Sequence, residues 1–181
     1  MIYLHNTRDL AHCKAIKLDD LRVWAGLVSM LDYDLEIPPK GMISKRCSIR
    51  TGVVSKSLKT LTENGFLLET NVNPKYASFE SMGQGSVPFS LNHLKEFSRN
   101  RTLYLAGMRV LYYLFGGIRR DNKVFDTNIT EISEVLQSDR ASTSKNIKQL
   151  KNENFLVAVN PEKGEKHFVI SRSTLGLLKR R

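Results

Sequence analysis

The segment Cys47–Leu67, CSIRTGVVSKSLKTLTENGFL, contains the strongest structural signals in this 181-residue sequence. It predicts a tight turn at 48–50, followed by a helix over 51–64. The apolar positions of that helix recur at spacings of four and three and form one buried face: Val54, Leu58 and Leu61. Gly65 then supplies a left-handed helix cap, and 66–70 is expected to be extended. The segment therefore predicts a helix that leads directly into a strand.

The surrounding sequence supplies the other elements of the same unit. Three helices are predicted before the turn: 6–16, 17–33 and, after the chain-breaking Pro38-Pro39, 40–47. After the strand, a turn at 71–75 and a return strand within 76–91 are expected to complete a hairpin. The predicted order is two helices, a short helix, a tight turn, a helix and a hairpin.

The second half of the chain repeats the first. Three blocks align in register: Ser55–Leu61 with Ser144–Leu150 and Glu63–Leu67 with Asn152–Leu156, both at a shift of 89 positions, and 18–27 with 105–114 at a shift of 87. Three blocks in register indicate an internal repeat. The elements predicted for the second copy are helices at 92–98, 102–115, 129–137 and 140–154, strands at 155–160 and 166–170, and a final helix at 173–178.

The second copy departs from the first at two positions. Asn154 takes the place of the capping Gly65, and asparagine also tolerates the left-handed conformation. Ser138 takes the place of the apolar turn residue Ile49. The tightness of the second turn is therefore left open by the sequence.

The segment 47–67 resembles the recognition helix and the start of the wing in many bacterial winged-helix DNA-binding proteins. The shared pattern is a small polar turn, Val-Ser-Lys, Leu-x-x-Leu and Asn-Gly-Phe-Leu, and 143–156 keeps most of it. The resemblance implies a mainly α fold with small β wings (α+β). It further implies two tandem winged helix-turn-helix domains, 1–88 and 89–181, related by the internal repeat. Tandem pairs in one small basic chain resemble the replication initiator proteins of plasmids and phages. Winged-helix transcription regulators resemble the chain nearly as well.

Positive charge is concentrated around the two predicted recognition helices. The chain carries 28 Lys and Arg against 18 Asp and Glu, a net charge of +10. No acid occurs in Ile37–Thr62, and a similar window at 140–151 ends before Glu153. A charged run is commonly no more than a solvated helix face. Two acid-free windows at matching places in the repeat nevertheless favour nucleic acid as the partner.

Residues opposite the buried stripe are expected to face DNA, because an α-helix fits the major groove, where each base pair displays a distinct pattern of donors and acceptors. In the first copy the candidates are Lys45, Arg46, Arg50, Thr51, Ser55, Lys56, Lys59 and Lys75. In the second copy they are Arg140, Ser142, Ser144, Lys145, Lys148 and Lys163. Hydroxyls at the helix start suit close approach, whereas lysines further along suit phosphates. Lys75 and Lys163 are placed at the hairpin tips, within reach of the DNA backbone or minor groove.

The sequence contains no clear motif for other chemistry. The four His and two Cys lack metal-ligand spacing, even around His12-Cys13, so neither a metal nor another cofactor is predicted. A phosphate-binding GxxxxGK(S/T) loop is absent. Asp32, Asp34 and Glu36 could form a nuclease cluster, but their place favours a helix end and loop. Tyr112, Tyr113 and Phe115 are expected in the core. We expect no catalytic residues and no enzymatic activity.

Location and assembly are also predicted from the sequence. No apolar run reaches the 18 or so residues of a membrane helix, and the first residues lack a signal-peptide pattern. We therefore expect no membrane partner and a cytoplasmic protein associated with the nucleoid or a plasmid. The strand-like Ile2–Leu4 has no wing before it, so we expect it to pair with a sheet edge of a second molecule, giving a homodimer.

The leading functional expectation is sequence-specific binding of double-stranded DNA by both recognition helices. Two half-sites one turn apart, about 10 base pairs, would follow if both helices contact the same face of the DNA. The expected context is replication initiation or copy control at repeated origin sites of a plasmid or other mobile element. Two alternatives are open. One is a winged-helix transcriptional repressor, and the other is a chromosome-associated protein-interaction module without direct DNA readout, which the acid-free helix faces disfavour.

Overall fold

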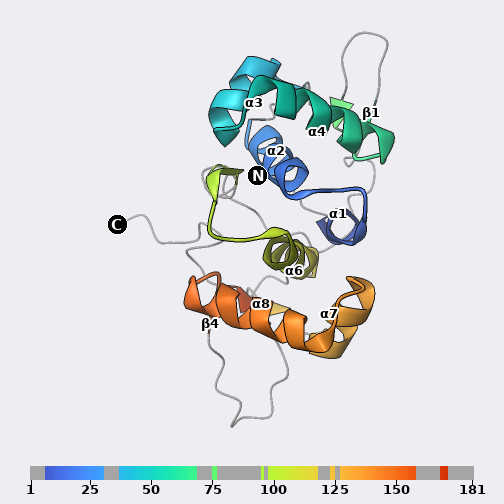
Figure 1. Ribbon diagram of the computed structural model, residues 1–181, viewed down its shortest axis with the longest axis vertical. Helices are drawn as coiled ribbons and strands as arrows, with labels where there is room; N and C mark the ends of the chain where they lie inside the picture. The colour runs from blue at the N-terminus through green and yellow to red at the C-terminus, as the bar shows by residue number, and fades with distance from the viewer. Residues whose placement is uncertain are drawn as a thin grey trace.

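The computed structural model describes residues 7–30, 37–68, 75–76, 95, 98–117, 123–124, 127–157 and 168–170. This part of the chain is mostly helical, with short strands (Figure 1). The α-rich class expected from the sequence is therefore confirmed. Several predicted features lie outside the described residues: Ile2–Leu4, Asp32, Asp34, Glu36, Lys163, the boundary at 88/89 and the final helix at 173–178.

The first half contains four helices and a hairpin among its described residues: α1 (Thr7–His12), α2 (Leu18–Val28), α3 (Lys40–Cys47), α4 (Thr51–Glu63), β1 (Leu67–Leu68) and β2 (Lys75–Tyr76). The second half contains α6 (Leu105–Phe115), β3 (Lys123–Val124), α7 (Ile129–Val135), α8 (Arg140–Asn152), β4 (Leu156–Val157) and β5 (Phe168–Ile170). Lys95 and Ser98–Arg99 are helical as well, so the helix predicted over 92–98 continues to Arg99. The helices predicted within the described residues are thus present, most of them with shorter ends.

The repeat is visible in the backbone. The bounds of α2 and α6 differ by 87 positions, from Leu18 to Leu105, and those of α4 and α8 by 89, from Thr51 to Arg140. Four described residues have a positive φ: Ser48 (55°) and Gln137 (50°), and Gly65 (77°) and Asn154 (62°). Each pair is 89 positions apart. The caps predicted at Gly65 and Asn154 are confirmed, and the left-handed conformation of Ser48 and Gln137 was not predicted.

The second turn is as tight as the first. Ile49 N–H donates to the Ser44 carbonyl at 3.1 Å, and Ser138 N–H donates to the equivalent Ser133 carbonyl at 2.9 Å. The two hydroxyls of Ser138 and Thr143 lie 2.7 Å apart and share a hydrogen bond. A polar pair thus occupies this turn without widening it.

Two predicted helices are shorter than expected, because nearby side chains form hydrogen bonds with the backbone where the helix was expected to continue. The helix predicted over 102–115 begins at Leu105, since the Asn100 Oδ1 accepts hydrogen bonds from the N–H groups of Thr102 (3.0 Å) and Leu103 (2.9 Å). This turn before the helix is an Asx-type alternative to helical bonding. The helix predicted over 17–33 ends at Val28, where the Ser29 hydroxyl donates to the Gly26 carbonyl at 2.6 Å.

The sheets required two corrections. In the first half β1 and β2 are antiparallel, with Leu68 opposite Lys75, so Lys75 begins the return strand and does not lie in the turn. In the second half the order is β3-β5-β4, so the predicted hairpin gains a third strand. β3 covers the free edge of β5, and its Val124 is fully buried, which seals the core. β3 was not predicted, because its two residues are too few to show the alternation that marks a strand.

The middle of the molecule is formed by α1, α2 and α6 (Figure 1). α1 packs along α6, and α2 also touches α6. Trp24 and Tyr112 are each 1 % exposed, their rings meet edge to face with centroids 5.6 Å apart, and the Tyr112 hydroxyl donates to the Leu21 carbonyl at 2.9 Å. The core positions expected for Tyr112, Tyr113 and Phe115 are confirmed. The two halves therefore share one apolar core.

The contacts between the halves are reciprocal. His12 Nδ1 donates to the Val135 carbonyl at the end of α7, at 2.9 Å. Arg99 Nε donates to the Arg46 carbonyl at the equivalent place in α3, also at 2.9 Å. Position 99 is 87 beyond 12, and position 135 is 89 beyond 46, so one contact is the repeat-equivalent of the other. α4 and α8 also run in opposite directions in Figure 1. The copies are thus related by an approximate two-fold axis, as in an isologous dimer.

Cys47 lies deep in the first half and provides a probe of its packing. Burial raises the pKa of its thiol to about 11, and its Sγ–H points at the Arg22 carbonyl 3.5 Å away. Since the thiolate is the reactive form, we expect Cys47 to resist a thiol reagent at about pH 8 while the half-buried Cys13 reacts. Both should react in denaturant. Equal rates in the native protein would contradict the buried position of Cys47.

Candidate nucleic-acid interface

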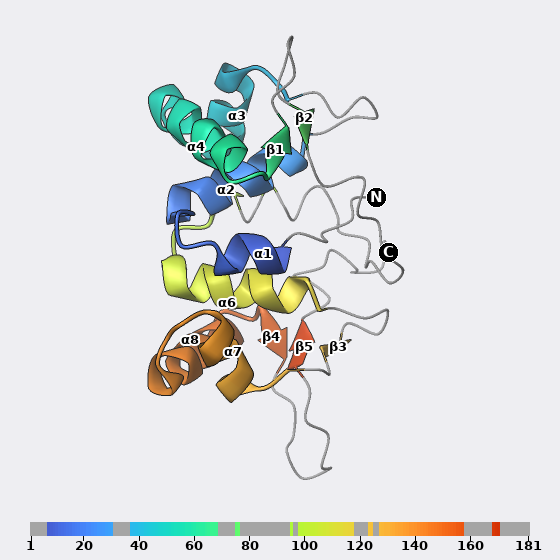
Figure 2. The same ribbon diagram turned by 90° about the vertical axis from the view of Figure 1, so that its right-hand side faces the viewer.

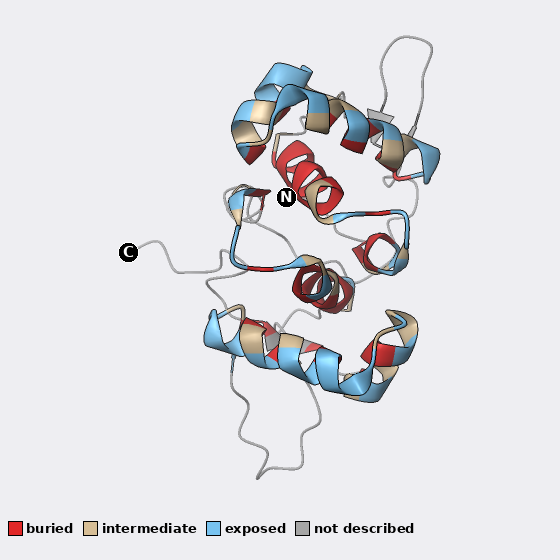
Figure 3. Cartoon of the chain, in the orientation of Figure 1, coloured by how far each residue is buried: buried red, intermediate tan, exposed pale blue. Residues whose placement is uncertain are grey.

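The exposed face of α4 is basic. Val54, Leu58 and Leu61 are at most 7 % exposed and turn toward α2, as the sequence period predicted. The helix places Lys56 and Lys59 on the opposite side, where both are exposed. Figure 3 shows this division, with exposed residues on the outer side of the ribbon. The buried stripe therefore holds α4 in place and presents its lysines to solvent.

α8 repeats the arrangement. Its buried residues are Thr143, Ile147 and Leu150. Lys145 and Lys148, the equivalents of the two α4 lysines, are exposed on the opposite side. Contacts with α6 hold this helix from behind, as contacts with α2 hold α4. Two equivalent helices thus present two lysines each, at the same turns.

The structure places most of the predicted site residues at the surface. The exposed ones are Lys45, Arg50, Thr51, Lys56, Lys59, Arg140, Ser142, Ser144, Lys145 and Lys148. Arg46 and Ser55 are partly buried. Lys75 belongs to β2 through its backbone, and Lys163 lies outside the described residues. The residues on α4 and α8 form two basic patches. The structure does not place the side chains of the wing lysines, Lys75 and Lys163, beside either patch.

The two basic helices lie on the same side of the molecule. In Figure 2, α4 and α8 occupy the left side at the upper and lower ends, and the strands of both halves lie toward the right. α1, α2 and α6 separate the helices along the long axis. One extended partner could therefore contact both helices at once.

Two connecting segments lie between the basic helices on that side (Figure 2). One follows α1, at 13–17, and its repeat-equivalent, 100–104, precedes α6. The second segment contacts the turn before α4 and also α8, since Arg101 donates to the Ser48 carbonyl at 3.1 Å and Gln149 of α8 donates to the Thr102 carbonyl at 3.2 Å. The exposed residues of these segments include Lys14, Lys17, Arg101 and Tyr104. Tyr104 is 76 % exposed.

These two segments, 13–17 and 100–104, form a central strip that was not predicted from the sequence. The two segments are short connections without periodicity, so no pattern marked them as part of a surface. The repeat could have found them, because 13–17 and 100–104 align at the shift of 87 and both contain basic residues. Their position between the two helices depends on the way the halves pack, which the sequence does not show.

The cations of the two patches are largely unpaired. The described part of the chain contains two ion pairs, Arg22 with Asp19 at 3.4 Å and Lys59 with Glu63 at 3.6 Å. In the second pair both side chains are well exposed, at 77 % and 59 %, so the pair is weak. Asn152 of α8 stands where α4 has Glu63. Glu63 therefore offsets part of the positive charge of Lys59, whereas no acid at the equivalent position offsets the charge of Lys148.

The starts of the two helices differ in charge. Asp139 caps α8, and its Oδ1 accepts a hydrogen bond from Ser142 N–H at 2.8 Å. Hydrogen bonds from the side chain and backbone of Ser142 lower the pKa of Asp139. Arg50 stands at the same place before α4 and makes no side-chain cap. The first turn of α4 is thus positive, and that of α8 begins with an acid followed by Arg140.

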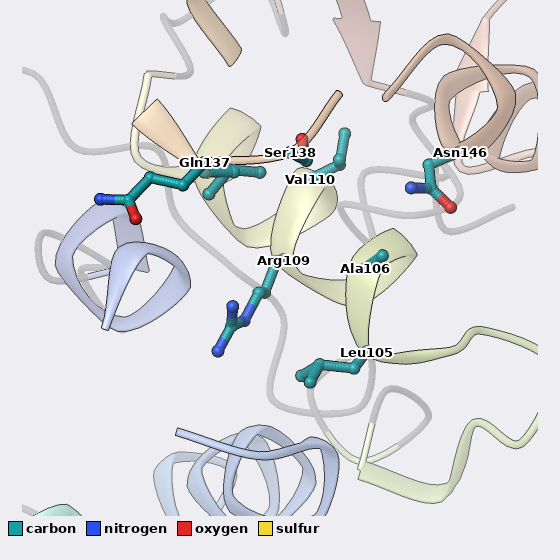
Figure 4. Close-up of a pocket in the computed structure, with 8 residues that line it drawn as sticks. Leu105, Ala106, Arg109, Val110, Gln137, Ser138 and Asn146 are labelled. Atoms are coloured by element: carbon teal, nitrogen blue, oxygen red, sulfur yellow. The ribbon is translucent and has the colours of Figure 1, made fainter. Parts of the chain in front are cut away.

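A cavity of about 300 Å³ lies behind α8, between that helix and α6 (Figure 4). Its lining is mostly apolar, with Leu105, Val110 and Leu136, and the polar ends of Gln137 and Asn146. Arg109 also borders it, but one of its Nη atoms donates to the Ile16 carbonyl at 2.8 Å. That guanidinium holds the connection after α1 in place. The cavity contains no acid, histidine or cysteine for catalysis.

The described residues show no grouping typical of a metal site or a membrane span. Within the described ranges, no three His, Cys, Asp or Glu side chains gather closely enough to bind a metal ion. His12 and Cys13 point to different partners, the Val135 carbonyl and the Asn64 Oδ1. None of the helices in the described residues has the length and apolar character needed to cross a bilayer. Comparison with known protein families, curated proteins and solved structures finds no match for this chain.

Proposed function

We propose that the chain is a sequence-specific double-stranded DNA-binding protein built from two tandem winged-helix domains, with α4 and α8 as recognition helices. The observation that carries the proposal is the pair of equivalent, exposed, lysine-bearing helix faces on one side of the molecule, in which Glu63 is the single acid of α4 and α8 contains none. In each half the order of helices, tight turn, exposed helix and antiparallel strands fits a winged helix. Helices held from behind by a buried stripe are suited to insertion into the major groove.

The division of roles follows from chemistry. Lys56, Lys59, Lys145 and Lys148 would contact phosphates and set the position of the protein on the duplex. The starts of the helices, including Arg50 and Arg140, would approach base edges. Gly52 and Ala141 support close approach, because both are small and exposed on the outer side of the first turn. Hydroxyl groups at Ser55 and Ser144 complete the same turns.

The biological role proposed first is replication initiation or copy control of a plasmid or other mobile element, as the sequence resemblance implies. Transcriptional repression is the second candidate. The approximate two-fold relation between α4 and α8 favours it, since repressors commonly bind inverted operator sites. Under either role, the protein would act in the cytoplasm on DNA, without a cofactor.

The test is selection of duplexes by the purified full-length chain, followed by a salt titration on the selected sequence. Each phosphate contact releases counterions, so log K should fall with log salt by about 0.9 per contact between about 0.05 and 0.2 M. We expect enrichment of a defined sequence and a slope that indicates several contacts. A flat salt response without enrichment would exclude DNA binding and favour the protein-interaction alternative.

A further inference from the structure

The relation between α4 and α8 constrains the DNA that both could contact. The reciprocal contacts of His12 with Val135 and of Arg99 with Arg46 place the first helix of each half against the other half. The shared core around Trp24 and Tyr112 fixes that arrangement. α4 and α8 consequently face the same side and run in opposite directions (Figures 1 and 2). Two helices related in this way meet a duplex in opposite orientations. Each presents its equivalent side chains to one half-site, and the two half-sites are read in opposite directions along the DNA.

We infer that one chain binds one imperfect inverted repeat, as a covalently linked equivalent of a symmetric dimer; the inference rests on the proposed DNA binding. A duplex has its own local two-fold axes, and inverted half-sites are related by one of them. Direct repeats are related by translation instead. A direct repeat would place one of the two helices in the wrong orientation on its half-site. The inference concerns the two half-sites bound by one chain, and such a target can itself be repeated along an origin.

The two helices also show where the half-sites agree and where they differ. Three outward positions are identical at the shift of 89: Ser55 and Ser144, Lys56 and Lys145, Lys59 and Lys148. The first turns are different, with Arg50-Thr51-Gly52-Val53 in α4 and Asp139-Arg140-Ala141-Ser142 in α8. The start of a recognition helix contacts base edges, so it determines sequence preference. The half-sites should share their phosphate spacing and differ in the bases contacted by the first turn.

The central strip fits the middle of such a target. The segments 13–17 and 100–104 are repeat-equivalent and lie between the helices, on the side they share. Their exposed basic residues would follow the backbone near the dyad of the duplex. This placement predicts protection of phosphates between the half-sites, even where no base is specified.

The first experiment compares arrangements of the selected half-sites. Duplexes would carry them head to head, tail to tail, as a direct repeat, or singly, with the full-length chain and stoichiometry measured by native mass spectrometry. We expect one inverted arrangement to bind one chain at least about 100-fold tighter than the direct repeat, and inserting about 5 base pairs, half a turn, to remove that gain. Tighter binding to the direct repeat, or one chain on each half-site, would overturn the inference while DNA binding stands. No binding to any duplex would instead refute the proposed function.

The second experiment makes the two recognition helices alike. The variant Arg50→Asp, Thr51→Arg, Gly52→Ala, Val53→Ser gives α4 the first turn of α8, including a capping residue, so its folding is favoured. We expect its preferred duplex to change to a symmetric inverted repeat of the α8 half-site. An unchanged preference would show that the two first turns do not determine the sequence bound and would overturn their assignment.

Discussion

The substitution Gly26→Ala is expected to lower the free energy of unfolding by about 1–3 kcal/mol, the usual cost of adding a carbon to a packed core. Gly26 lies within the buried α2. A Cβ there would collide with Cys47 Sγ and lie 3.3 Å from Ser98 Cβ, which belongs to the other half of the chain. In an open helix the same change would stabilise, because alanine is the better helix former. Chemical denaturation measures the sign directly.

Two further variants identify the cause. At Gly41 in α3 a Cβ meets nothing within 4 Å, so Gly41→Ala should stabilise by roughly 0.5–1 kcal/mol. Cys47→Ala removes the sulfur that the new methyl group meets. The double variant Gly26→Ala/Cys47→Ala should therefore lose less unfolding free energy than the two single variants lose in sum. The expected difference is about 0.5–3 kcal/mol. Additive effects would show that the sulfur is not what resists the methyl group.

Gly26 also illustrates what sequence periodicity can and cannot predict. The helix around it was predicted from the spacing of its leucines, and its start at Leu18 agrees within one residue. Its repeat-equivalent is Tyr113, a large residue stacked under Arg8 with 4.7 Å from the guanidinium carbon to the ring centre. The close approach of Cys47, and behind it of Ser98, to α2 explains the small residue. That approach is a long-range contact, and no local pattern encodes it.

For the candidate site, too, one part could be predicted from the sequence and another could not. The outward lysines of α4 and α8 could be predicted because a buried stripe at helical spacing defines the opposite face. The joint orientation of the two helices could not, since it depends on contacts such as that between His12 and Val135, which are 123 positions apart. β3 was missed for a related reason. Two residues acquire a strand role only when β5 offers them an edge.

The left-handed residues before the two turns show a further limit. Gly65 could be predicted because glycine adopts a positive φ without strain. Ser48 and Gln137 adopt it at 55° and 50°, although neither residue type signals that conformation. The bonds of Ile49 and Ser138 to the preceding helices fix this geometry. The backbone hydrogen bonds of a helix end thus outweigh the conformational preference of the single residue, and the equivalence of the two copies shows that this is systematic.

Reversing the charge of the outward lysines should have the largest effect on DNA binding. The double variant Lys145→Glu/Lys148→Glu removes two phosphate contacts from α8 and adds repulsion, so the salt slope should fall by about 1.8 and specific binding should be lost at about 0.2 M salt. The fold should be unaffected, since both side chains are exposed. Lys145→Arg/Lys148→Arg keeps the charges and should keep the slope. Loss of affinity in this control would indicate a role other than phosphate contact.

The same change in α4 should cost less, for a reason visible in the structure. Lys59 lies 3.6 Å from Glu63, whereas α8 has Asn152 at that position, so part of the Lys59 charge is already offset. Lys148→Ala is therefore expected to reduce the salt slope by about one, and Lys59→Ala by less. Glu63→Gln should remove that difference, because it frees the charge of Lys59: affinity should rise, and Lys59→Ala should become as costly as Lys148→Ala. If Lys59→Ala and Lys148→Ala already had equal effects with Glu63 in place, the ion pair would have no influence on DNA binding. If neither variant changed the slope, the two helix faces would not contact phosphates, and the assignment of α4 and α8 as recognition helices would fail.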